Sequence, residues 1–202
     1  MPSKAQRSRN AGFRRETDLR RRVNTRQERR LVLVVTNGVS TEMSYFDALR
    51  REPWVTADKV KVKLERGEPT AVVLRAARIR DDNAYDEAWV VCDVDQFDVK
   101  PAITAAAERE VELTLSLPSF EVWLILHVSE GCPGFNNATQ ADRHLKGLLP
   151  SWDKTNLKFS DFRGGVDDAV VRAKRLGEPP DANPSTAVWR LIESIRNPPE
   201  SI

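Results

Sequence analysis

The chain has 202 residues, of which 40% are hydrophobic and 31% charged. This length and composition exclude a wholly disordered chain and are enough for one hydrophobic core and a small subdomain. The net charge of +2 is unevenly spread, because residues 1–30 hold 11 Lys/Arg and 3 Asp/Glu, a local +8 that leaves −6 on the remaining 172 residues. No apolar run approaches the roughly 20 residues of a membrane-spanning helix, and the basic N-terminus lacks the apolar stretch of a secretory signal. We therefore expect a soluble, cytoplasmic protein with no membrane partner.

Residues 1–30 are expected to form a basic, flexible N-terminal arm, since they contain too few apolar side chains to pack. Such an arm could neutralise nucleic-acid phosphates and make binding strongly salt-dependent. It could equally be a solubilising tail, and the sequence leaves both interpretations open. Cys92 and Cys132 lie far apart without C-x-x-C spacing, so reduced, structural thiols are expected.

Residues 31–117 alternate strand and helix patterns. The run LVLVV at 31–35 is typical of a strand buried on both faces. Further strands are expected at 60–64, 88–95 and 111–117, and helices near 40–52, 71–80 and 98–109. This alternation predicts an α/β fold with a mainly parallel, Rossmann-like sheet flanked by helices.

Residues 118–202 are expected to form a helical C-terminal part packed on this core. Helical patterns cover 120–128, 138–149, 166–176 and 185–195, and loops are expected at 131–137 and 151–165.

Ligands of open parallel sheets bind beyond the carboxyl ends of the strands, so the polar residues there are the first candidates for a site. Asp93 and Asp95 follow the third expected strand and would share one side of it in extended geometry. Two such carboxylates repel each other unless a cation lies between them, and Mg²⁺ or Mn²⁺ prefers oxygen ligands. A solvated turn is the alternative. The loop at 36–42 after the first strand is neither a Walker loop nor a G-x-G-x-x-G fingerprint.

Three other features have ordinary structural explanations beside functional ones. Glu121 would stand in the first turn of a helix, where the macrodipole favours an acidic side chain. Asn183 or Ser185 could cap the last helix, with Pro184 at its start. His127 follows three apolar residues, which is more typical of a hydrogen-bonded core histidine than of a catalytic base.

Four blocks, in this order, resemble the RloB-like family, whose fold is similar to the TOPRIM domain of primases, topoisomerases and overcoming-lysogenization-defect nucleases. They are LVLVVTNGVSTEMSYFDAL, VVCDVDQFD, LPSFEVWLILH and NPSTAVWRLIE. The first is similar to a strand and Glu-Gly-x-x-Thr-Glu-x-x-Tyr-Phe loop of the family, and the third to its Asn-Pro-Ser-Phe-Glu-x-Trp-Leu-Leu-Leu-His block. The resemblance extends from about Leu31 to Ile195.

This resemblance implies a TOPRIM-type nuclease that cleaves RNA (tRNA among the candidates) or DNA with Mg²⁺ or Mn²⁺, in a phage-defence or restriction-associated system. The resemblance also implies an ATPase or a restriction-system protein as a partner. An oligomer of the chain is compatible with the resemblance. Asp93 and Asp95 would be the metal ligands and Glu121 a further acidic residue. The residues that would support the substrate or the structure of the site are His127, Asn183, Ser185 and Thr186.

One departure from the family pattern bears directly on activity. Asn37 stands where the family loop has glutamate, and an amide neither transfers a proton nor brings negative charge to a cation. Leu117 also replaces the asparagine of the third block. Either the chain is an inactive or altered member that binds nucleic acid or nucleotide without cleaving it, or Glu42 supplies the missing carboxylate.

Overall fold

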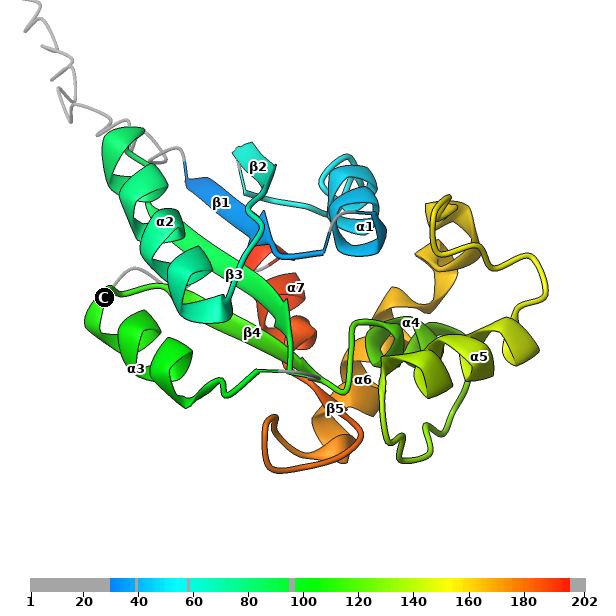
Figure 1. Ribbon diagram of the computed structural model, residues 1–202. Coiled ribbons are helices and arrows are strands. Elements are labelled where there is room, and N and C mark those ends of the chain that lie inside the picture. The colour runs from blue at the N-terminus through cyan, green and yellow to red at the C-terminus, as the bar shows by residue number, and fades with distance from the viewer. Residues whose placement is uncertain (1–29, 39, 58, 95–96, 197–202) are drawn as a thin grey trace, which may run out of the picture.

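The computed structural model describes residues 30–38, 40–57, 59–94 and 97–196, so the expected arm lies outside it except for Arg30, and Asp95 lies outside it too. The described residues form one five-stranded sheet in the order β2-β1-β3-β4-β5, with helices on both faces (Figure 1). The predicted mainly parallel, Rossmann-like α/β fold is confirmed, and so is the helical C-terminal part.

The first four strands are parallel, as predicted. They are β1 (Leu31–Thr36), β2 (Lys59–Leu64), β3 (Glu87–Asp93) and β4 (Glu112–Leu117). The fifth strand, β5 (Ser185–Thr186), pairs antiparallel with β4 and was not predicted. Two residues are too few to show the period-2 pattern by which a strand is recognised in a sequence.

Within the described part of the chain, seven α-helices connect and cover the strands. They are α1 (Thr41–Leu49), α2 (Pro69–Asp82), α3 (Lys100–Glu108), α4 (Glu121–Val128), α5 (Ala138–Leu148), α6 (Val166–Leu176) and α7 (Val188–Arg196). The loop at 151–165 contains two short 3₁₀ helices, η1 (Phe159–Asp161) and η2 (Arg163–Gly165). The expectation that the last helix begins at Ser185 was wrong: Ser185 and Thr186 pair with β4, and α7 starts only at Val188.

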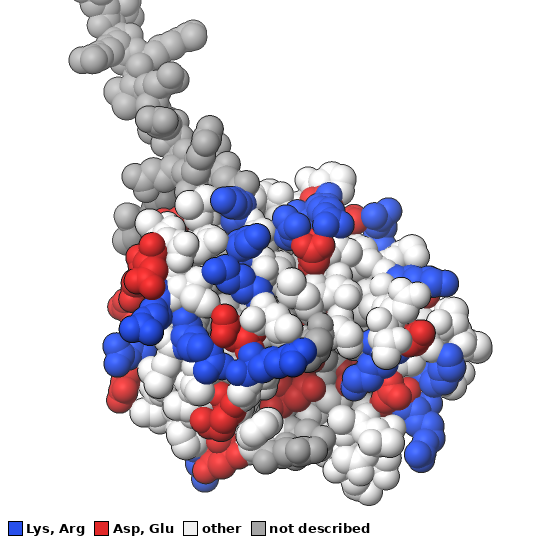
Figure 2. All heavy atoms as spheres, turned by 45° about the horizontal axis from the view of Figure 1, so that its top comes forward, with Lys and Arg blue, Asp and Glu red and all other residues white. Residues whose placement is uncertain are grey.

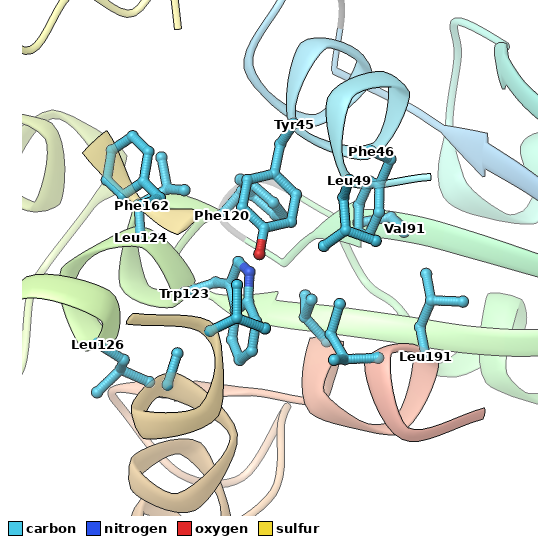
Figure 3. Close-up of a cluster of buried hydrophobic side chains, with 14 of the residues drawn as sticks. Tyr45, Phe46, Leu49, Val91, Phe120, Trp123, Leu124, Leu126, Phe162 and Leu191 are labelled. Atoms are coloured by element: carbon cyan, nitrogen blue, oxygen red, sulfur yellow. The ribbon is translucent and has the colours of Figure 1, made fainter. Parts of the chain in front are cut away.

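Each face of the sheet has its own hydrophobic core. On one face α2 and α3 pack on a cluster that includes Leu33 and Val35 of β1. On the other face Val32 and Val34 join a larger cluster with side chains of α1, α4 and α7. Figure 3 shows this second core, where Tyr45 of α1 points toward Trp123 of α4.

The helical part at α4–α6 extends beyond the carboxyl ends of the strands (Figure 1). Its loop at 151–165 reaches α1, because the Thr41 hydroxyl lies 3.3 Å from the Lys154 carbonyl oxygen. The edge of the sheet where a Rossmann-like fold binds ligands is therefore flanked by residues of the helical part. Within the described ranges no helix is long and apolar enough to cross a membrane.

Candidate acidic site at the carboxyl edge of the sheet

The loop after β1 lies beside the end of β3. The Asn37 amide N–H donates to the Val91 carbonyl at 3.1 Å, so the backbone pairing of these strands continues one residue past β1. Beyond β3, the Val94 N–H donates to the Ser116 carbonyl of β4 at 3.0 Å. The residues that follow β1 and β3 are thus neighbours, as expected for adjacent parallel strands.

Asp93 is the last residue of β3 and lies on the α1 and α4 face of the sheet. One carboxylate oxygen accepts the backbone N–H of Phe120 at 2.9 Å, just before α4 begins. Burial, followed by repulsion from Glu42 and Glu121, raises the pKa of Asp93 well above its usual value. The fold therefore holds Asp93 where its negative charge is unfavourable without a nearby cation.

Glu42 is the second carboxylate, and it comes from the first turn of α1. Its side chain is folded over the loop after β1, since a Cβ atom at Gly38 would lie 1.8 Å from one Glu42 carboxylate oxygen. Glu42 is 7% exposed, and this burial raises its pKa, while a hydrogen bond to its own backbone opposes the rise and Glu121 adds to it. A side chain larger than hydrogen at position 38 would displace this carboxylate.

Glu121 is the third carboxylate and the first residue of α4. Its two oxygens are taken by two different donors: the Lys154 ammonium group at 2.6 Å and the Ser119 hydroxyl at 2.6 Å. The side chain of Glu121 is 2% exposed and that of Lys154 is 49% exposed, so the pair reaches from the interior to the surface. Although partial burial opposes it, the charge of Glu121 holds the pKa of Lys154 above its usual value.

Lys154 was not among the residues expected at the site. It lies in a polar loop far from the matching blocks, and a single lysine in such a loop carries no pattern that would distinguish it. Only the fold brings it to Glu121, with further attraction to Asp93. The site therefore combines three carboxylates with one cationic side chain.

Asn37 contributes an amide to this edge. Its side chain is half-buried and makes no hydrogen bond to any other residue in the described ranges. Position 37 thus carries a neutral group at the carboxyl edge of the sheet, directly after the strand that neighbours β3. The predicted contact between Asp93 and Asp95 lies outside the described residues.

The described residues test how well a divalent cation fits here. No three His, Cys, Asp or Glu side chains in those ranges are arranged to hold one metal ion together. Mg²⁺ commonly binds proteins through only one or two carboxylates, with water and substrate phosphates as its other ligands. The carboxylates of half-buried Asp93 and buried Glu42, which repel each other, are of the chemical kind that fits this mode.

His127 is part of the core and not of the acidic site. Nδ1 lies 2.8 Å from the Trp123 carbonyl oxygen and Nε2 lies 3.0 Å from the Tyr45 hydroxyl, so the neutral ring donates to the first and accepts from the second. Burial lowers the pKa of His127 to about 4, while the bond to Trp123 opposes the change and Arg172 adds to it. His127 therefore supports the packing of α1 against α4.

The block from Asn183 to Thr186 is mainly structural, and the expected capping by Asn183 or Ser185 was wrong. Asn183 makes two hydrogen bonds to the backbone of Phe135, at 2.7 and 3.3 Å, and Ser185 donates to the Ala182 carbonyl at 2.5 Å. The capping contact comes from Thr186, whose hydroxyl accepts the Val188 N–H at 3.4 Å.

Thr186 is also connected to the acidic edge by a buried polar row. Its hydroxyl lies 2.8 Å from the Ser116 hydroxyl, and Ser116 pairs with Asp93 in the register of β3 and β4. Thr186 therefore stands two strands from Asp93 on the same row of the sheet.

These features define a Rossmann-like α/β protein with carboxylates gathered at the carboxyl edge of its parallel strands. The chain belongs to the RloB-like protein family, whose model matches residues 32–195. No curated protein and no solved structure matches it.

Proposed function

We propose that the protein is a divalent-metal-dependent, TOPRIM-type nuclease whose site is the acidic edge formed by Glu42, Asp93 and Glu121. The observation that carries this proposal is the convergence of three carboxylates from α1, β3 and α4, with burial raising the pKa of two of them. Buried carboxylates that repel one another are costly to the fold. Their retention at a ligand-binding edge is explained if they serve a cation.

Asp93 and Glu42 would hold the cation, together with Asp95. When bound, Mg²⁺ or Mn²⁺ supplies Lewis-acid stabilisation of a phosphodiester and a hydroxide near neutral pH. The Phe120 N–H fixes one oxygen of Asp93, which leaves the other available to a ligand. Gly38 provides the space in which the Glu42 carboxylate lies beside the loop after β1.

Glu121 and Lys154 would act as a pair. Ser119 and Lys154 orient the Glu121 carboxylate, and the half-exposed ammonium group of Lys154 can also attract a substrate phosphate. The association of RloB-like proteins with phage-defence or restriction loci makes RNA or DNA the proposed substrate. An ATPase or restriction-system protein is the proposed partner.

Asn37 should limit the activity of this chain. A lost general acid or base typically costs about 10²–10⁴ in rate, and the Asn37 amide can replace neither the proton transfer nor the charge of a glutamate. Asn37 is half-buried at the carboxyl edge, so a glutamate there would keep partial access to solvent.

The test is cleavage of mixed tRNA, single-stranded DNA and duplex DNA with Mn²⁺, by the protein and by its Asn37→Glu variant. We expect little cleavage by the first and strong cleavage by the second. Asn37→Glu combined with Asp93→Asn should be inactive, and Asn37→Gln is the matched control for size. No cleavage of any substrate by Asn37→Glu would contradict the proposal, whereas rapid cleavage by the unmodified protein would assign the missing role to Glu42, tested by Glu42→Gln.

A second function is favoured by Asn37 itself: binding of nucleic acid or nucleotide at the same edge without cleavage. It predicts binding that depends on Asp93 and on Mn²⁺, with no product formed by either the unmodified protein or its Asn37→Glu variant. Binding and cleavage measured on the same oligonucleotides separate the two functions.

A further inference from the structure

Strand β2 carries lysines on one face only. Val60 and Val62 are buried in the core with α1 and α4, whereas Lys59 and Lys61 are exposed and Lys63 is half-exposed. The register places Lys61 beside Leu33 and Lys63 beside Val35, so these lysines lie on the α2 and α3 face of the sheet. Because β2 is the edge strand, the row is open to solvent on its outer side.

A further basic residue follows the strand, and these basic side chains have no acidic partner among the described residues. Arg66 follows β2 and is exposed, and none of the four basic side chains forms an ion pair with another described residue. The one acidic residue of this segment, Glu65, is paired with Arg75 of α2 at 3.0 Å. We call Lys59, Lys61, Lys63 and Arg66 the β2 ridge. Figure 2 shows Lys and Arg side chains gathered in a band on the face that includes this edge.

The β2 ridge ends at the carboxyl edge of the sheet, the edge at which the acidic site lies. Its direction is that of the parallel strands, so its last member is at their carboxyl edge. There the Glu65 N–H donates to the Thr36 carbonyl at 3.0 Å, which places the start of the β2–α2 loop directly beside the Asn37–Gly38 loop. A polyanion lying along the ridge would therefore arrive at the carboxyl edge, and it would cross this edge to reach Glu42, Asp93 and Glu121 on the α1 and α4 face.

The shape of the ridge selects among anionic ligands. Alternate residues of a strand are about 6.6 Å apart, so the lysines form a line of regularly spaced charges and not a converging pocket. A line fits a ligand that repeats its charge, and a groove of positive charge that follows the backbone is the usual way in which proteins bind single strands. A compact anion would contact one lysine at a time.

We propose that the β2 ridge binds the sugar–phosphate backbone of a single-stranded nucleic acid and directs it into the acidic site, an inference that rests on the proposed function. Lysines on an edge strand also protect it from pairing with other strands, but protection does not require a further basic residue, Arg66, at the start of the β2–α2 loop.

The test is the salt dependence of binding of a fluorescent 12-nucleotide single strand, as RNA and as DNA, measured by anisotropy with EDTA. The variant is Lys61→Gln with Lys63→Gln. The matched control is Arg143→Gln with Arg175→Gln, which removes the same charge from exposed arginines of α5 and α6 that form no ion pair with another described residue. The full chain is used throughout.

We expect the slope of log K against log salt to become shallower by about 1.4 in the β2 variant, about 0.7 for each lost phosphate contact on a single strand, and the Kd at 0.1 M salt to rise by at least about tenfold. The control should keep the slope of the original protein. An unchanged slope in the β2 variant, with or without new self-association, would overturn the proposal. So would binding to phosphatidylserine vesicles in the absence of oligonucleotide binding.

Because EDTA removes the metal, this experiment is independent of cleavage. A shallower slope without cleavage by Asn37→Glu would support the ridge and contradict the nuclease. Cleavage by Asn37→Glu with an unchanged slope would support the nuclease and contradict the ridge.

Discussion

Asp93 shows how a single residue can be unfavourable for the fold and useful for binding. Because burial and the neighbouring carboxylates raise its pKa, the folded state favours the protonated form. Between the usual pKa of an aspartate and this raised value the folded chain binds more protons than the unfolded chain, so the contribution of Asp93 to stability falls as the pH rises. At pH values above the raised pKa, each pKa unit of the shift lowers the free energy of unfolding by about 1.4 kcal/mol.

Asp93→Asn should therefore stabilise the metal-free protein at pH 7.5, with a gain of about 2–4 °C in Tm for each kcal/mol recovered. The amide oxygen of asparagine can still accept the Phe120 N–H, so the local geometry is kept. The gain in Tm should disappear near pH 4, where Asp93 is protonated. In Asp93→Asn, Mn²⁺ should no longer stabilise the protein. Thermal unfolding with EDTA and with Mn²⁺ measures both, and Asp181→Asn, an exposed aspartate, is the control. A lower Tm of Asp93→Asn than of the unmodified protein at pH 7.5, or an equal stabilisation of both by Mn²⁺, would contradict this account.

His127 titrates in the opposite sense. Its pKa is lowered from 6.5 to about 4, so the unfolded chain binds more protons between these values and stability is lost as the pH falls through them. This difference amounts to about 2 kcal/mol of lost stability at pH 5 relative to pH 7.5.

Urea unfolding at both pH values should show this loss in the protein and in the control His144→Gln. In His127→Gln the pH dependence should be smaller by about 2 kcal/mol, although the variant is less stable at both pH values because the bonds to Tyr45 and Trp123 are disturbed. Equal pH dependence in the two variants would show that His127 is not held neutral by the core.

At the scale of elements, the loop at 151–165 completes the acidic site from outside the sheet. It is attached to α1 through Thr41 and to α4 through the pair of Lys154 and Glu121. Its other contacts include the ion pair of Arg163 with Glu52 at 2.7 Å and the edge-to-face packing of Phe159 on Tyr45, with 5.3 Å between the ring centroids. The position of Lys154 thus depends on the packing of the loop and not on the local sequence.

Lys154→Met should leave the buried Glu121 carboxylate without its cation and lower the free energy of unfolding by roughly 1–3 kcal/mol. Mn²⁺ should restore part of the loss if a divalent ion can replace the ammonium group near these carboxylates. Lys158→Met, an exposed lysine of the same loop without an ion pair among the described residues, is the control for urea unfolding with and without Mn²⁺. Destabilisation equal to that of the control would indicate that Lys154 does not compensate Glu121.

At the scale of the whole molecule, charge is separated along the chain and across the surface. The part after residue 30 carries −6, yet the β2 ridge is basic and the carboxyl edge beside it is acidic. The contribution of the arm to binding stays a prediction, since residues 1–29 lie outside the described ranges. Arg30 belongs to the folded part, where it is paired with Glu87 at 2.5 Å.

The sequence by itself determined the α/β class and the succession of four strands and their helices along the chain, because buried strands and amphipathic helices impose local periodicities that depend only on nearby residues. It also placed Asp93 and Asn37 at strand ends, where parallel strands bring their polar residues together. The family followed from four short blocks whose residues are fixed in order and spacing.

Only the tertiary structure decided which polar residues meet. Lys154 reaches Glu121 across 33 positions of the chain, Asn183 turns to Phe135 instead of capping a helix, and β5 exists only because β4 offers a free edge. The exposure of the lysines on β2 likewise follows from the place of that strand at the edge of the sheet. Contacts of this kind depend on distances between segments far apart in the chain, and no local pattern encodes them.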